Sequence, residues 1–252
     1  MKSKIFSATI ALLFCIGVST AKAQAGFDVE AGAIFTGYND VRIPGNQGTF
    51  FSLKDDLSPK ADFFYRLRLN YTINSRHTLS LLYAPLKIQS EGRVSNAIFF
   101  QDKLFAANTE LIGTYKFNSY RLTYRYEIVQ NPRFAFGLGL TAKIRDAEIR
   151  LTSQGQTAEK INVGFVPIIN FRLWWKINEE FSLLLDGDAL AAPQGRAADV
   201  QLAAAYRLSD DLTIRAGYRI LEGGADNDEV YNFSLFHYAS VGLSFTLRNR
   251  TR

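Results

Sequence analysis

Residues 120–128 read YRLTYRYEI, and this stretch decides the fold. Successive side chains of a β-strand point to opposite faces, so alternate residues share a face. One face carries Tyr120, Leu122, Tyr124, Tyr126 and Ile128, and the other carries Arg121, Thr123, Arg125 and Glu127. In a soluble sheet the aromatic face would be the core and the charged face would meet water. In a membrane barrel the assignment is inverted.

The same two-residue periodicity continues along the chain, and helical periodicity is hard to find after residue 26. We predict ten strands: 27–38, 63–73, a third beginning at Thr78, a fourth that contains the opening stretch and ends near Gln130, a fifth beginning at Phe134, then 163–177, 181–189, 199–208, 212–220 and 233–247. In the fifth strand the apolar parity slips, so that Ala147, Ile149 and Leu151 become the apolar set. We expect a β-bulge between Arg145 and Asp146 to cause this slip.

The predicted connections alternate in length. After even strands they are tight and rich in turn residues, at 74–77, 131–133, 178–180 and 209–211. After odd strands they are mostly longer, at 39–60, 90–109, 152–161, 190–198 and 222–232. An even number of strands with alternating short and long connections is typical of outer-membrane barrels, whose periplasmic turns are short. A soluble meander has no reason to sort its loops in this way.

The composition of the two faces also favours the inverted assignment. Aromatic residues gather near the predicted short turns, as an interfacial girdle would require: Tyr71, Tyr126, Phe134, Trp175, Phe181, Tyr206 and Phe245. The opposite face mixes Gly, Ala, Ser and Thr with charges that are mostly Arg, as a narrow lumen would need. We therefore predict an all-β fold, a transmembrane antiparallel up-and-down β-barrel of ten strands with both termini periplasmic. Eight strands is the alternative if two segments are misjudged.

The charged face supplies a candidate lumen network. Its members are Arg66, Arg68, Arg121, Arg125, Glu127, Lys143, Arg145, Glu148, Arg150, Arg172, Asp186, Asp188, Arg207, Arg215 and Arg219. A ten-stranded barrel is only slightly wider than the eight-stranded size that side chains fill, so such charges must pair or stay hydrated. The planar fork of Arg suits bidentate pairing with carboxylates. We expect a salt-bridged network with basic charge in excess.

The N-terminus has the pattern of a secretory signal. Lys2 and Lys4 precede a mostly apolar run at 5–18, and small residues at Ala21 and Ala23 fit a peptidase site before Gln24. The apolar run is shorter than the roughly 20 residues of a membrane-spanning helix. We predict a signal peptide at 1–23 and a barrel domain at 24–252. Phe14 precedes Cys15 where a lipoprotein would have a small residue, so lipidation is disfavoured.

The composition excludes several function classes. Met1 and Cys15 are the only Met and Cys of the chain, so the predicted mature protein has no disulfide and no thiolate metal site. The formal net charge is +5, and without the three lysines of the signal it is about +2. No basic run indicates nucleic-acid binding.

The last predicted strand carries a separate pattern. Ser240, Gly242, Phe245 and Leu247 combine a polar residue, a glycine and alternating apolar residues. The pattern resembles the C-terminal signal of outer-membrane barrel proteins, which implies the barrel assembly machinery as a partner during biogenesis. The usual chain ends on the aromatic residue, whereas residues 248–252 follow here.

The chain as a whole resembles a group of small bacterial outer-membrane β-barrel proteins without assigned activity. The resemblance covers nearly all of residues 26–247 and is carried by YKFNSYRLTYRY (115–126), TAKIRDAEI (141–149), NVGFVP (162–167), PQGRAAD (193–199) and GYRILEGGADNDEVYNF (217–233). It implies an outer-membrane location in contact with lipid. It carries over no catalytic residue.

Catalytic chemistry is hard to place on this sequence. Nucleophilic hydrolysis needs a base beside a Ser, and only His77 and His237 are available. His237 and Ser240 are three apart on one strand, so they face opposite sides. Asp226 and Asp228 lie in a predicted extracellular loop without complete calcium-loop spacing. We therefore assign no catalytic, cofactor-binding or metal residue and expect the protein not to be an enzyme.

The sequence leaves three function classes open. The first is a structural protein or narrow passive channel, whose Arg-rich lumen would favour small anions if open. The second is a lipid- or peptide-modifying enzyme with its site at the outer rim. The third is a surface adhesion or ligand-binding barrel that acts through its extracellular loops.

Overall fold

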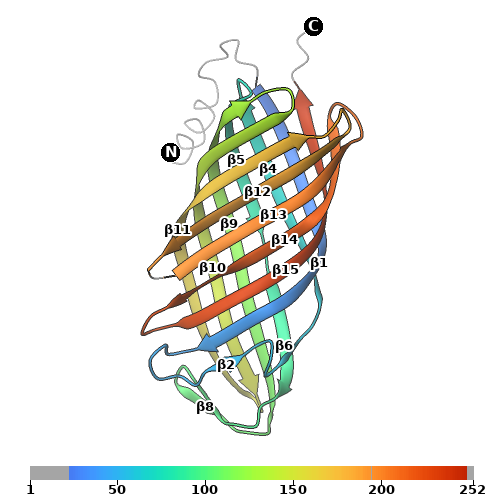
Figure 1. Cartoon of the computed structure of the whole chain (residues 1–252). Helices are drawn as coiled ribbons and strands as arrows, with labels where there is room; N and C mark the ends of the chain where they lie inside the picture. Colours follow the sequence, from blue (N-terminus) through green and yellow to red (C-terminus); the bar gives the residue numbers. More distant parts are fainter. Residues whose placement is uncertain (1–22, 194, 249–252) are drawn as a thin grey trace, which may run out of the picture.

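The computed structural model describes residues 23–193 and 195–248 and is all-β. Ten strands close into one antiparallel up-and-down barrel, which confirms the predicted fold class and strand number (Figure 1). The barrel strands are β1 (Ala23–Arg42), β4 (Asp62–Ile73), β5 (His77–Ala84) with β6 (Lys87–Arg93), β9 (Glu110–Gln130), β10 (Phe134–Ser153), β11 (Gln156–Lys176), β12 (Phe181–Ala192), β13 (Gly195–Arg207), β14 (Leu212–Asp226) and β15 (Tyr231–Arg248). No helix among these residues is long and apolar enough to cross a membrane.

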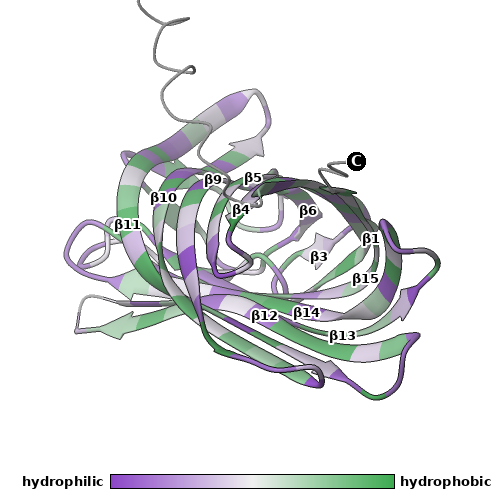
Figure 2. Ribbon diagram, turned by 90° about the horizontal axis from the view of Figure 1, so that it is seen from above, coloured by the Kyte–Doolittle hydropathy of each residue, from purple (hydrophilic) through white to green (hydrophobic). Residues whose placement is uncertain are grey.

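The sheet closes because β1 pairs with β15 on one side and β4 on the other. Its register with β15 runs from Gln24 opposite Arg248 to Arg42 opposite Tyr231. β5 and β6 are two pieces of one barrel strand, because both pair with β9. The strands lie around a central space in the view from above (Figure 2). β1 begins and β15 ends at the end of the barrel that carries the short turns, the upper end in Figure 1.

Most strands are longer than the sequence predicted. They continue past their apolar stretches at the end with the long connections, so these connections are shorter than expected. Two long connections also contain short strands that the sequence did not indicate: β2 (Phe51–Ser52), β3 (Ser58–Pro59), β7 (Ile98–Phe100) and β8 (Lys103–Phe105).

The predicted bulge between Arg145 and Asp146 is wrong. Both residues keep an unbroken register with β9 and with β11. The register of β10 with β9 shifts instead between Phe136 and Gly137, opposite Ile128. A second shift lies between Thr36 and Tyr38 in β1. The change of apolar parity along β10 therefore needs another cause.

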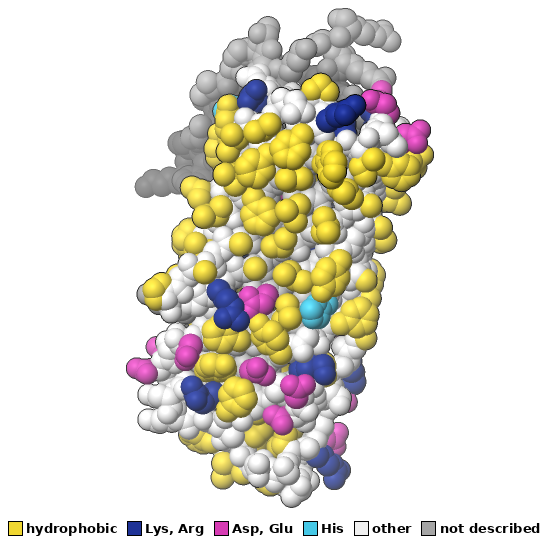
Figure 3. All heavy atoms as spheres, in the orientation of Figure 1, with side chains coloured by type: hydrophobic (Ala, Val, Ile, Leu, Met, Phe, Trp, Pro, Cys, Tyr) yellow, Lys and Arg dark blue, Asp and Glu magenta, His cyan; other side chains and the backbone are white. Residues whose placement is uncertain are grey.

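The parity of the opening stretch has the inverted, membrane-type assignment. Arg121 is 4% exposed, whereas Leu122 beside it is 50% exposed. Hydrophobic side chains cover a broad band of the outer surface next to the short-turn end, and charged side chains gather toward the opposite end (Figure 3). Predicted girdle residues on this surface include Tyr71, Trp175 and Phe245, which are all exposed.

At the long-loop end the two faces exchange character. Ile149 and Leu151 point inward and belong to an apolar core with Tyr115 and Phe236. This core is completed by the cap, which we define as segments 43–60 and 94–109. Buried cap residues are Ile43, Phe51, Leu53, Leu57, Ile98, Phe100 and Phe105. The side chains of β10 therefore keep their faces past Arg145. The inward face changes from charged to apolar there because the interior of the barrel changes from the charged lumen to the capped core.

Candidate functional site

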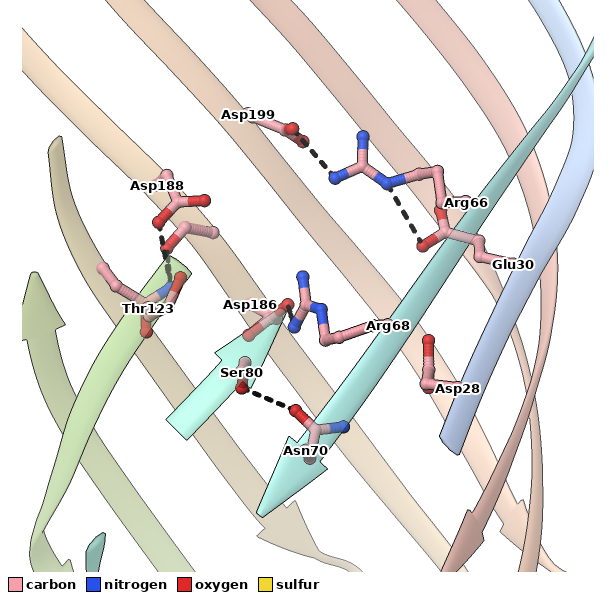
Figure 4. A network of polar contacts seen from close by, with 12 residues as sticks. Asp28, Glu30, Arg66, Arg68, Asn70, Ser80, Thr123, Asp186, Asp188 and Asp199 are labelled. Atoms are coloured by element: carbon pink, nitrogen blue, oxygen red, sulfur yellow. Dashed lines mark hydrogen bonds and ion pairs between the residues drawn. The ribbon is translucent and has the colours of Figure 1, made fainter. Parts of the chain in front are cut away.

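A layer of paired charges crosses the lumen. Asp199 on β13 accepts hydrogen bonds from Arg219 Nη1 at 2.6 Å and Arg66 Nη2 at 3.0 Å. Arg121 on β9 bridges Asp199 and Asp188. Because β4 and β9 are not neighbours of β13 in the sheet, these bonds join separate parts of the wall. Figure 4 shows Arg66 between Asp199 and Glu30, with Arg68 directed at Asp186.

The layer extends beyond this hub. Glu30 on β1 receives two bonds from Arg219, and Arg215 pairs with Asp28. Asp188 also accepts from Thr141 at 2.6 Å and Asn170 at 3.0 Å. Buried carboxylates are costly unless ion pairs and hydrogen bonds both satisfy them, and these acids have both.

The structure brings most of the predicted lumen residues together. Basic side chains of the lumen outnumber acidic ones: Arg66, Arg68, Arg121, Arg125, Lys143, Arg145, Arg172, Arg215 and Arg219 against Asp28, Glu30, Glu127, Asp186, Asp188 and Asp199. Arg125 pairs with Glu127 on its own strand at 3.0 Å. Arg207 lies at the short-turn rim, where Glu179 pairs with it.

Glu148 and Arg150 do not belong to the lumen. They alternate with Ile149, which points into the core, so their side chains lie on the outer face. Glu148 pairs there with Lys116, and Arg150 pairs with Glu148 and Glu159. Placing them inside was wrong because it assumed the bulge that β10 lacks.

The sequence reasoning missed three of the lumen acids, Asp28, Glu30 and Asp199. Asp28 and Glu30 alternate with Phe27 and Val29 in β1, so the parity rule could have found them. Asp199 is the first residue of the predicted strand 199–208, and the candidate lumen network did not include it. Asp199, like Glu30, is contacted by three arginines.

The charge layer separates two cavities. On the short-turn side lies one of about 160 Å³, lined by charged residues that include Arg68, Arg125, Arg172 and Asp186. The Arg172 guanidinium lies over the Trp174 ring, 5.6 Å from its centroid. On the cap side lies a larger cavity of about 700 Å³.

The larger cavity, called the cap-side cavity below, has mostly apolar walls and a polar floor. Its apolar lining includes Ile43, Tyr115, Phe117, Ala147, Ile149, Val166, Ile168, Leu190, Leu221 and Val230. Its floor is made by Arg121, Lys143, Arg145, Asp188 and Asp199. The hydroxyl groups of Tyr115 and Ser234 share a hydrogen bond of 3.0 Å, so Tyr115 is a wall residue whose polar group has a partner.

Two cations of this floor have no acidic partner among the described residues. Lys143 is 2% exposed, and its ammonium lies over the Phe117 ring, 4.6 Å from the centroid. The guanidinium of Arg145 donates to the side-chain oxygen of Asn162. Asp188 and Asp199 border the same cavity, but Arg121, Arg66 and Arg219 already bind them. The cavity therefore joins apolar walls to two basic side chains that lack an ion pair within the described part of the chain, while Glu148, Glu222, Asp228 and Glu229 also border it.

The two histidines lie outside this site. His77 opens β5, and its Nδ1 is 2.9 Å from the Tyr124 hydroxyl on the outer surface. His237 shares a hydrogen bond with the exposed Tyr218, while Ser240 points inward. Among the described residues, no group of His, Cys, Asp and Glu could hold a metal ion.

The remaining predicted sites concern biogenesis. Ser240, Gly242, Phe245 and Leu247 lie in β15, which continues to Arg248. The assembly signal and its partner stay predictions. Of the predicted signal peptide, only Ala23 is among the described residues.

The fold is similar to solved outer-membrane proteins. The chain matches the outer membrane protease OmpT from Escherichia coli with a TM-score of 0.56 and 10% identity, over 89% of this chain and 97% of that one. It matches Ail, the attachment invasion locus protein of Yersinia pestis, with a TM-score of 0.39 and 12% identity, over 88% and 99%. A FadL homologue from Pseudomonas aeruginosa gives 0.38 and 10%, over 89% of each chain.

No family model matches the chain, and no curated protein sequence matches it. At these identities the similarity shows the fold alone. A closed barrel with an apolar exterior and a charged interior satisfies its backbone and its charges within a bilayer. The chain is a β-barrel of the bacterial outer membrane.

Proposed function

We propose that this barrel binds a small amphiphilic anion in its cap-side cavity. The observation that carries the proposal is Lys143, a buried lysine that lines a mostly apolar cavity and has no acidic partner among the described residues. A volume of about 700 Å³ lies within the range of about 300–1,000 Å³ that is usual for ligand pockets. The proposed ligand has a carboxylate at the Lys143 end and a hydrocarbon body against Ile149, Ile168 and Leu190.

This proposal is a form of the third function class, a ligand-binding barrel, but its site lies inside the barrel rather than on the extracellular loops. The charge layer gives less support to a passive channel, because its bonds join separate parts of the wall across the lumen. A hydrolytic enzyme with its site in this cavity also has less support, because no histidine that could act as the base is among the described residues that line the cavity.

Calorimetric titration of the protein in lipid nanodiscs with octanoate, a water-soluble carboxylate, tests the proposal. We expect saturable binding that empty nanodiscs lack. Each methylene added from hexanoate to decanoate should tighten binding about fourfold while the chain stays within the cavity, since one buried methylene contributes about 0.8 kcal/mol.

Lys143→Met removes the proposed anion partner and keeps an unbranched side chain. It should weaken octanoate binding about tenfold or more, because a charge-assisted hydrogen bond contributes about 1.5–3 kcal/mol. Lys176→Met is the control, because Lys176 is exposed at the short-turn end of β11. Octanoate binding that Lys143→Met leaves unchanged, or no binding to the unmodified protein, would refute the proposal.

A further inference from the structure

The barrel wall has a gap beside β11. This strand pairs with β10 along almost its whole length, from Gln156 to Trp175. Its pairing with β12 covers only Ile169 to Lys176. No described strand pairs with residues 156–168 on the other side, because the β12–β13 hairpin turns back between Ala192 and Gly195. We call the space between residues 161–168 of β11 and the described hairpin residues 190–193 and 195–197 the notch.

The far end of this free edge is closed by other contacts. Side chains of the cap bind β11 carbonyls there: Lys103 Nζ to Thr157 O at 2.6 Å and Gln101 Nε2 to Glu159 O at 3.1 Å. Lys160 reaches across to Glu229 on the β14–β15 hairpin at 3.3 Å. The wall is therefore closed at 157–160 and interrupted at 161–168.

Pro167 suits the notch. The carbonyls of Thr157 and Glu159 point away from β10, toward the free edge. Pro167 has the same parity on the same unbroken register, so its backbone nitrogen points to that edge as well. Proline has no N–H, and it occurs in sheets mainly on edges where no partner strand takes that bond. The sequence of β11 thus has an edge residue where pairing with β12 ends.

The notch leads into the cap-side cavity. Val166 on β11 and Ala192 on the hairpin both line that cavity, from opposite sides of the notch. Val166 is also the cross-strand partner of Lys143, so the unpaired cation lies next to the opening. The charge layer closes the route along the barrel axis on one side, and the cap covers the cavity on the other. The cap contacts the β14–β15 hairpin through Asn46 N and Asp228 O at 3.3 Å.

The outer surface at the notch is mixed, because apolar side chains of β11 lie beside acids of β10: Val163 is opposite Asp146, and Ile161 is opposite Glu148. Ile161, Val163 and Phe165 alternate on the outward face of β11, and Val163 and Phe165 are 67% and 68% exposed. The notch therefore opens where the apolar band of the outer surface meets its charged end. An acyl chain that enters there reaches Val166 and Ile168, which line the cavity.

We propose that the notch is a lateral entry for a fatty acid, which passes from the outer leaflet of the membrane into the cap-side cavity with its carboxylate toward Lys143. This inference rests on the proposed binding function and adds the ligand class and its route. The hydrocarbon chain would lie between Val166 and Ala192 during entry.

Obstruction of the notch tests the route. Parinaric acid, a fluorescent fatty acid, is preloaded into donor vesicles, and its association is followed by energy transfer from Trp174 and Trp175. Ala192→Phe places a ring inside the notch, and Ala191→Phe, its neighbour on the outward face, is the matched control. We expect Ala192→Phe to slow association about tenfold or more. Release of bound parinaric acid to acceptor vesicles should slow by a similar factor, because entry and release use the same route, and Ala191→Phe should change neither rate.

The outcomes separate the two proposals. If octanoate binds in a Lys143-dependent way but Ala192→Phe associates with parinaric acid as fast as the unmodified protein, the lateral route is overturned and the binding function stands. If octanoate does not bind at all, both fall. If Ala192→Phe does not fold, Ala197→Phe introduces the same ring from the β13 side of the hairpin, and the same slowing is expected.

Discussion

Arg219 holds Glu30 in a bidentate ion pair, with Nε to Oε1 and Nη2 to Oε2 each at 2.8 Å. The two residues belong to β14 and β1, which are separated by β15 in the sheet. Both side chains are almost fully buried, and the third nitrogen of the same guanidinium reaches Asp199. One arginine thus neutralises carboxylates from two strands of the lumen.

Arg219→Met should destabilise the barrel strongly. It leaves Glu30 without its bidentate partner and removes one of three arginines from Asp199. Removing one partner of a buried pair costs about 3–5 kcal/mol. Denaturant unfolding in lipid vesicles, followed by tryptophan fluorescence, measures the loss. Arg207→Met is the control, because its pair with Glu179 is exposed and should contribute less than about 1 kcal/mol. Equal losses for both variants would contradict the buried layer.

Leu122→Arg tests the outward face of the opening stretch. An arginine on the lipid face of a membrane barrel costs about 2–4 kcal/mol near the midplane. On a solvated surface a residue that is half exposed would tolerate the change. The same unfolding measurement distinguishes the two. Gln89→Arg is the control, since Gln89 is exposed on β6 beside Glu91, near the cap. A neutral Leu122→Arg would mean that this face does not contact lipid.

Two residues show how far the sequence predicts the fold and where it stops. The alternation around Arg121 gave the strand, its faces and the enclosed lumen, because one physical rule holds along that part of β9. The same rule misplaced Glu148, because the environment inside the barrel changes from charged to apolar along β10. The sequence of one strand does not contain that change. It comes from Phe51, Leu57 and Phe100, cap residues distant in sequence that fold into the barrel.

The site was predictable in part for the same reason. The alternation of side chains identified Lys143 as a lumen residue. Its lack of an acidic partner depends on the pairing of Asp188 and Asp199 with arginines of other strands. Pairing across a barrel is set by strand tilt and closure, which local patterns do not encode. The notch likewise depends on where β12 turns back relative to β11.

Gly113→Phe should displace the cap without unfolding the barrel. A Cβ atom at Gly113 would overlap Leu53 Cδ2 and lie 3.1 Å from Leu57 Cδ1, so a ring there has to expel these leucines. We expect faster tryptic cleavage at Lys54 and Lys60, with the heat-modifiable gel migration of the folded barrel retained. Thr114→Phe, on the opposite face of β9, should leave cleavage unchanged. Equal cleavage of both variants would show that the cap does not pack on Gly113.

Asp199→Ala should turn a closed barrel into a conducting one. Arg66, Arg121 and Arg219 share this carboxylate, and without it three guanidinium groups repel one another across the lumen. In planar bilayers we expect no stable conductance steps from the unmodified protein and anion-preferring steps from Asp199→Ala. Glu179→Ala, which removes an exposed rim acid, should remain silent. Steady anion-preferring steps from the unmodified protein, altered by Arg121→Ala, would instead support the passive channel, because the charge layer would then have to open without mutation.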